Sequence, residues 1–316
     1  MLSAIKGINR INDYAFKRIM GSEEGKEALL GLLNAVLKPP PGKELESIEL
    51  KDRDIDPEHL VDRGARLDIL AKTTEGTLIN IEVQIANEYN LDQRILYYWG
   101  RVYCGQLTSG DLFSKLKRTI NIVLLAFNWF QDNRYHRSFH LKDDETGEAL
   151  TDLLEIHILE IEKIKGIGRR PKDALEAWLV YFSNLEGKEM EEIAMENPAI
   201  RKALTVEEMF WQSEKERRIY ELQEKALHER LSALAEAMAE GEARGEAKAK
   251  QDDICKFMAR RFGIALSEIL PKVKQMTNLE ILDHVMEELF AANTVEEAHA
   301  IIHDGLSQVS SVENKV

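Results

Sequence analysis

Cysteine is scarce in this chain of 316 residues, which contains only Cys104 and Cys255. Two cysteines so far apart provide neither the disulfide framework of a small secreted domain nor a cysteine zinc site. Apolar runs are also short, and none approaches the roughly 18 residues that a membrane helix requires. The first 17 residues lack the apolar segment of a secretory signal. We therefore expect a cytoplasmic protein without a membrane partner.

Positive charge is in deficit, with 42 Lys and Arg against 56 Asp and Glu and a formal net charge of −14. Bulk electrostatics therefore give no sign of a nucleic-acid partner. Residues 1–165 hold 22 basic and 27 acidic side chains, so most of the acidic excess lies downstream. A locally basic groove around a carboxylate-lined metal site remains compatible with this balance. The 44% hydrophobic content argues against a disordered chain and suffices for one core and a second, smaller one.

Helical and strand patterns alternate through the first 165 residues. Asn12 can cap a helix over DYAFKRIM, and Ser22 can cap a second helix that ends before Pro39. A third helical pattern covers 91–109, and an all-apolar strand covers 119–127. Period-two alternation typical of strands recurs in five further segments, namely 46–50, 65–72, 77–85, 138–141 and 153–163. This order predicts an α/β fold with a mixed sheet, in which 65–85 forms an antiparallel hairpin.

Downstream of this core, the pattern is helical throughout. We expect residues 166–212 to form a helical extension that packs on the 1–165 core, with a break at Asn197-Pro198. Residues 213–250, rich in Glu, Ala, Lys and Arg, fit a long charged helix or short coiled coil. Two glycines near its end cost about 1 kcal/mol each, which predicts a frayed tether over 240–250. Residues 251–316 fit a small helical bundle.

One set of polar residues interrupts the apolar pattern of the hairpin. Glu82 and Gln84 lie two apart on one predicted strand and therefore point to the same face. Asp68 lies on the preceding strand, at a position that pairs with residue 81 or 82 across the turn. The first helix adds Asp13, and Lys17 lies one turn later on the same side. These five side chains are the candidate site.

Two converging carboxylates with an amide oxygen suit a hard cation, Mg²⁺ or Mn²⁺. Such an ion orients and polarises a phosphate and lowers the pKa of a bound water. The third group of such a strand motif is often a lysine; Gln84 can hydrogen-bond a water here but supplies no charge. The competing interpretation places Asp68 and Glu82 on the solvent face of an edge hairpin, and the Asp13–Lys17 pair on an exposed helix surface.

Three segments together resemble a known family. NDYAFKRIMG, RLDILAKTTEGTLINIEVQ and QRILYYWGRVYCGQLTSGD are similar to the recombination-promoting nuclease (Rpn) or putative transposase family of the PD-(D/E)XK nuclease superfamily. The resemblance covers roughly residues 8–230. It implies a PD-(D/E)XK-like mixed sheet flanked by helices, followed by an all-α C-terminal region, and an endonuclease that cuts DNA with a divalent metal.

The resemblance also implies roles for individual residues. Asp68 and Glu82 match the metal ligands, and Gln84 matches the remaining active-site position. Asp13 and Lys17 match the first-helix motif. The residues that match the helix facing the sheet, and hence substrate, are Arg94, Tyr97 and Tyr98.

Two hypotheses follow from the sequence. The first is a Mg²⁺-dependent DNA endonuclease linked to recombination, transposition or defence. The second is a catalytically inactive nuclease-fold protein that acts as an interaction or regulatory module through its helical C-terminal half. In both, the helical regions favour a homodimer.

Overall fold

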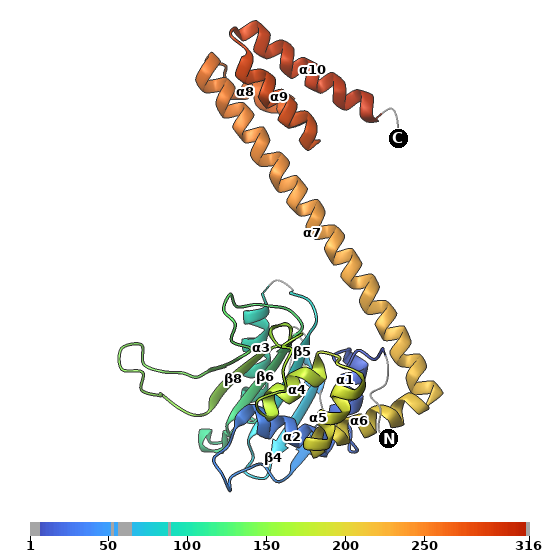
Figure 1. The fold of residues 1–316 in the computed structure, drawn as a ribbon. Coiled ribbons are helices and arrows are strands. Elements are labelled where there is room, and N and C mark those ends of the chain that lie inside the picture. Colours follow the sequence, from blue (N-terminus) through green and yellow to red (C-terminus); the bar gives the residue numbers. More distant parts are fainter. Residues whose placement is uncertain (1–6, 52–53, 56–64, 88–89, 314–316) are drawn as a thin grey trace. The chain divides into compact units, whose positions relative to one another are not determined.

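The structure, a computed structural model, describes residues 7–51, 54–55, 65–87 and 90–313. Contacts between residues divide the chain into two compact units, Met1–Leu227 and His228–Val316. Figure 1 shows the sheet and most of the helices in the first unit. The four-segment division expected from the sequence stays a prediction.

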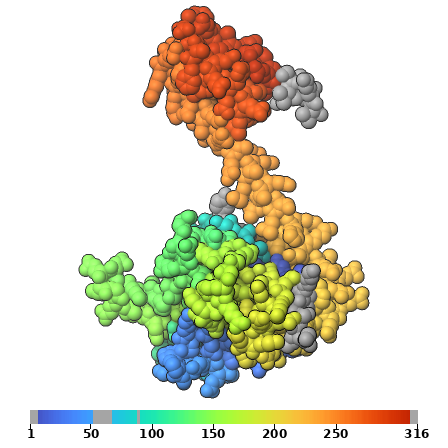
Figure 2. All heavy atoms as spheres, in the orientation of Figure 1, coloured from blue at the N-terminus to red at the C-terminus, as the bar shows by residue number. Residues whose placement is uncertain are grey.

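A six-stranded mixed sheet forms the centre of the first unit. In spatial order its strands are β1 (Ile48–Leu50), β4 (Ile69–Thr73), β5 (Leu78–Gln84), β6 (Thr119–Leu125), β8 (Leu154–Glu160) and β7 (His136–Phe139). Strands β5, β6 and β8 run parallel, whereas both edges pair antiparallel. Every residue of β6 is buried, as expected of a central strand covered on both faces. β2 (Asp54–Ile55) and β3 (Ala65–Arg66) form a separate pair. The segment between β7 and β8 projects from the unit (Figure 2).

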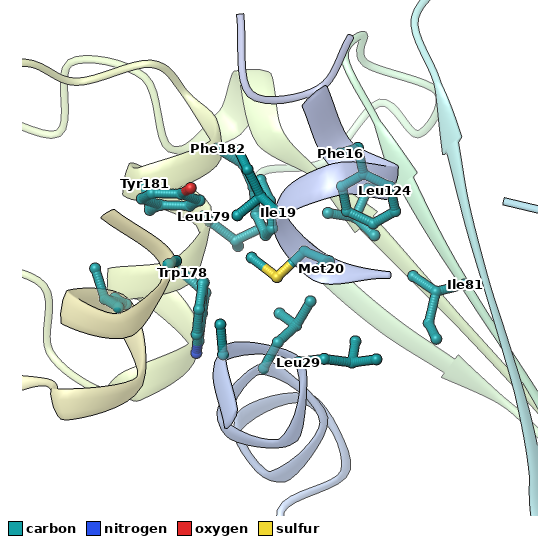
Figure 3. Close-up of a cluster of buried hydrophobic side chains, with 14 of the residues drawn as sticks. Phe16, Ile19, Met20, Leu29, Ile81, Leu124, Trp178, Leu179, Tyr181 and Phe182 are labelled. Carbon is teal, nitrogen blue, oxygen red and sulfur yellow. The ribbon is translucent and has the colours of Figure 1, made fainter. Parts of the chain in front are cut away.

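The larger core lies on one face of this sheet. The helices that cover it are α1 (Asp13–Met20), α2 (Lys26–Leu37), α4 (Ala174–Phe182), α5 (Gly187–Glu196) and α6 (Pro198–Gln212). Figure 3 shows Phe16 and Met20 of α1 packed between the sheet residue Leu124 and the aromatic side chains of α4, among them Trp178. This packing fixes α1, and with it the polar side chains on its outer surface, against the sheet.

A smaller core covers the opposite face. There Leu91 and Ile95 of α3 (Leu91–Cys104) pack with Val123 and Leu125 of β6. Glu82 lies on this same face, because residues alternate along β5 and its neighbours Ile79 and Ile81 join the larger core.

The second unit is helical. It contains the greater part of α7 (Glu214–Phe262), followed by α8 (Leu266–Val273), α9 (Leu279–Ala291) and α10 (Val295–Glu313). Two short 3-10 helices in the first unit, η1 (Phe113–Lys115) and η2 (Ile161–Lys163), complete the elements of the described residues. None of the helices in the described part of the chain is long and apolar enough to span a bilayer.

The fold class predicted from the sequence is confirmed, but four local predictions are wrong. Helix α2 begins at Lys26, because Ser22 Oγ accepts the Gly25 N–H at 3.2 Å and closes a turn instead of capping the helix. The predicted 65–72 strand is interrupted between β3 and β4, and the strand predicted at 138–141 is β7, which begins two residues earlier. Helix α7 continues through 240–250, where the sequence predicted fraying.

Candidate active site

The β4–β5 hairpin brings two carboxylates together. Ile69 pairs with Ile81, so Asp68, just before β4, lies opposite Glu82. The Asp68 N–H points to Glu82 Oε1 at 3.4 Å, and the Val83 N–H donates to Asp68 Oδ2 at 2.9 Å. Glu82 is only 5% exposed. At this interruption of the strand, Asp68 bonds to β5 through its side chain, which accepts the Val83 N–H, and through its main-chain N–H, which donates to the Glu82 side chain.

Helix α1 adds a cation to this pair. Asn12 caps the helix through its side-chain oxygen, and Asp13 occupies the first turn. One turn later, Lys17 Nζ lies 2.5 Å from Asp13 Oδ1 and 2.9 Å from Asp68 Oδ1. The interpretation of Asp13 and Lys17 as an isolated surface pair therefore fails, since Lys17 reaches across to the sheet. The positive charge that Gln84 does not supply is provided from α1.

Burial dominates the electrostatics of the site. It raises the pKa of Glu82 to about 8, and the neighbouring charge of Asp68 adds to this effect. Burial also raises the pKa of Asp68, against the opposing influence of Lys17. For Lys17, burial alone would favour the neutral amine, but the carboxylates of Asp68 and Asp13 raise its pKa, so it is an ammonium at neutral pH.

Two buried asparagines form a part of the site that the sequence analysis missed. Asn80, two residues before Glu82 on the same face, donates through Nδ2 to Asn121 Oδ1 of β6 at 2.6 Å. Asn121 in turn donates to the Ile95 carbonyl of α3 at 3.2 Å. Both asparagines are fully buried. The signal was present in the sequence, as a polar residue inside each of two apolar strands, at the same position in LINIEVQ and TINIVLL.

The other predicted site residues lie at the end of β5 and on α3. Gln84 ends β5, half-buried, on the same face as Glu82, and its carbonyl accepts the Ala126 N–H at 2.9 Å. Arg94 and Tyr98 are half-buried on α3, one turn apart, and the Tyr98 ring lies 5.9 Å from that of Tyr97. The structure thus joins Asp68, Glu82, Lys17 and Asp13 through contacts, whereas substrate contacts by Arg94 and Tyr98 stay a prediction.

The donor set fits a hard divalent cation that is held by few protein ligands. No group of three or more His, Cys, Asp or Glu side chains in the described residues could hold a metal ion. Two carboxylates nevertheless suffice for Mg²⁺, which usually keeps several waters and is completed by substrate phosphates. Among the described atoms, the buried Asn80 Oδ1 accepts no hydrogen bond, so an unused oxygen lies on the face of Glu82. Asp68 and Glu82 are the residues that would hold the ion.

The candidate site lies within a segment that matches a protein family. The model of the PD-(D/E)XK nuclease family transposase matches residues 10–237, more than half of the chain and every residue of the candidate site. The chain belongs to this family. Within a PD-(D/E)XK nuclease family transposase, a mixed sheet that carries paired carboxylates points to a nuclease-like function. No curated protein and no solved structure matches the chain.

Proposed function

We propose that this family member is a metal-dependent endonuclease that hydrolyses DNA phosphodiester bonds. One observation carries the proposal: the Glu82 carboxyl group accepts the Asp68 N–H at 3.4 Å, and the Asp68 carboxylate lies 2.9 Å from the Lys17 ammonium, so acidic and basic side chains from three separate segments meet at one place. Keeping these ionisable groups away from water without a use for them would cost stability. The family match, which includes transposases in its description, supports DNA as the substrate.

Each side chain receives a role from its position. Asp68 and Glu82 would hold Mg²⁺ or Mn²⁺, and the ion would polarise the phosphate and lower the pKa of a water. Gln84 orients that water through its amide. Lys17 offers an ammonium to a phosphate oxygen, and Asp13 holds Lys17 in place. Hydrolysis by water needs no covalent intermediate on the protein.

On α3, Arg94 is proposed to contact a DNA phosphate. Tyr98, which packs beside Tyr97, is proposed to contact the same substrate. Helix α3 itself packs against β6 on the face that bears Glu82, where Asn121 donates to the Ile95 carbonyl.

The second candidate function is an interaction module that does not cut DNA. It is favoured by apolar side chains left exposed on α7, where Leu222 is 62% and Met238 48% exposed. We propose that this helix pairs with a second copy of the chain to form a homodimer, which is compatible with either function.

Binding of Mg²⁺ separates the two candidates. A ligand that binds only the folded state raises the unfolding temperature. We expect Mg²⁺, at concentrations well above its dissociation constant, to raise the unfolding temperature of the full-length protein but not of Asp68→Asn. Glu75→Gln, an exposed change in the turn of the same hairpin, is the matched control and should respond like the wild type. An equal response of Asp68→Asn and wild type would remove Asp68 from the metal site, and no response of either would favour the interaction module.

A further inference from the structure

The cap of α1 is held by the first turns of α7. Asn12 is 1% exposed, and its side-chain oxygen accepts hydrogen bonds from the N–H groups of Tyr14 and Ala15. Its amide nitrogen donates in the other direction, to Glu224 Oε2 at 2.7 Å. Glu224 therefore fixes the orientation of the amide that begins α1.

The residues around this cap are held by the same helix. Glu224 Oε1 accepts a hydrogen bond from Asn9 Nδ2 at 3.2 Å, and the Tyr220 hydroxyl accepts the Asn9 N–H at 2.9 Å. Farther along α1, Arg18 donates to Glu216 at 2.7 Å. Positions 216, 220 and 224 follow a four-residue spacing, so these three side chains share one face of α7. That face of α7 contacts the chain just before α1, at Asn9 and Asn12, and again near the end of α1, at Arg18.

From this arrangement we infer that Tyr220 and Glu224 are positioning residues for the candidate active site. They determine where α1 begins, and Lys17 reaches Asp68 at 2.9 Å from the second turn of that helix. A displacement of about 1 Å is enough to impair a catalytic arrangement. The inference rests on the proposed function, because it assigns α7 a part in the same site.

A purely structural role for Glu224 makes a different prediction. If Glu224 only attached α7 to the first unit, its loss would lower stability and leave the surroundings of Lys17 unchanged. A positioning role instead requires Lys17 to separate from Asp68 when the cap loses its partner. The acylation rate of Lys17 distinguishes the two, because an ammonium held by two carboxylates reacts slowly with an amine-specific reagent.

The test uses the full-length protein and the Glu224→Ala variant. We expect Glu224→Ala to lower kcat for Mg²⁺-dependent plasmid nicking by roughly tenfold at unchanged KM. Mass spectrometry should show several-fold faster acetylation of Lys17 by an N-hydroxysuccinimide ester. Glu221→Ala is the matched control: its side chain is 62% exposed and lies 3.9 Å from Arg217 of the same helix. It should change neither quantity.

If Glu224→Ala does not fold, a second pair of variants tests the same contact by exchanging the amide at position 12 and the carboxylate at position 224. Asn12→Asp retains a good helix cap but sets two carboxylates against each other, so Lys17 should acetylate faster. Adding Glu224→Gln lets the introduced amide donate to the introduced carboxylate and should restore the wild-type rate. Unchanged Lys17 acetylation in folded Glu224→Ala, or no restoration in the double variant, overturns the positioning role. If the wild type does not nick DNA, the proposed function fails, while the acetylation rates still decide this inference.

Discussion

At the scale of single residues, the ammonium of the candidate site comes from helix α1 and not from the sheet. Lys17 reaches Asp68 from α1, and position 84 on β5 carries a neutral amide. If the charge matters more than its origin, a lysine at either position should serve. Removing it altogether leaves the buried carboxylates without their nearest cation.

Lys17→Met should therefore lower the nicking rate by roughly tenfold to a hundredfold. Adding Gln84→Lys should recover part of that loss, since the new ammonium would project from the same face as Glu82. The comparison is made by plasmid nicking in Mg²⁺ with wild type, single and double variants. Full activity of Lys17→Met would show that the lysine is not part of the reaction.

At the scale of elements, α7 differs most from what the sequence predicts. Gly241 and Gly245 lie inside the continuous helix, and a Cβ at either position would meet no atom within 4 Å. Ion pairs at four-residue spacing support the helix here, because Arg244 pairs with Glu240 across Gly241 and Lys250 pairs with Glu246 beyond Gly245. Farther on, Ala247 is buried in the core of the second unit.

Replacing both glycines by alanine should stabilise α7 by about 1 kcal/mol each and raise its melting temperature, followed by circular dichroism at 222 nm. Gly263→Ala is the control with the opposite sign, because Gly263 has a φ of +69° that a side chain disfavours. A frayed tether at 240–250 would instead leave the melting temperature of the double variant unchanged.

Edge strand β7 introduces a dependence on pH. His136 Nε2 lies 2.8 Å from His157 Nδ1, and His157 Nε2 lies 2.7 Å from Glu155. Burial, with the neighbouring His157, lowers the pKa of His136 to about 4. Between about pH 6.5 and pH 4, His136 is protonated in the unfolded chain but stays neutral in the folded chain. The free energy of unfolding that is present above about pH 6.5 is therefore lost as the pH falls toward 4.

His136→Gln should therefore lose less stability than the wild type between pH 6.5 and 4.5, measured as the midpoint of urea unfolding. His284→Gln, at a histidine whose side chain is 51% exposed, is the control and should follow the wild-type profile. Parallel profiles for His136→Gln and wild type would show that His136 does not titrate in this range.

The sequence identified the elements whose patterns are local. Alternation predicted the β4–β5 hairpin and the opposition of Asp68 and Glu82, because pairing across a short turn leaves little choice of register. The contacts of α1 with α7 could not be predicted, because Asn12 and Glu224 are 212 residues apart in the chain. Likewise, helix propensity alone does not reveal that Ala247, just beyond the two glycines of α7, is buried in the core of the second unit.

At the scale of the whole molecule, we expect the chain to self-associate through α7. Leu227, Leu231, Leu234 and Met238 follow the alternating three- and four-residue spacing of a coiled-coil seam on α7. Light scattering should give the full-length protein twice the mass of one chain, and the double variant Leu231→Glu/Leu234→Glu the mass of one. Ala233→Glu, an exposed position off this stripe, should remain dimeric. A monomeric wild type would refute the dimer.

If Asp68 and Glu82 hold the metal of a DNA endonuclease, nicking of a plasmid must require both the metal and Glu82. Purified full-length protein is incubated with supercoiled plasmid in Mg²⁺, in Mn²⁺ and in EDTA, beside Glu82→Ala. We expect nicking by the wild type in either metal, none in EDTA, and a loss of at least about a hundredfold in Glu82→Ala. Nicking that persists in Glu82→Ala, or a wild type inactive in both metals, would contradict it.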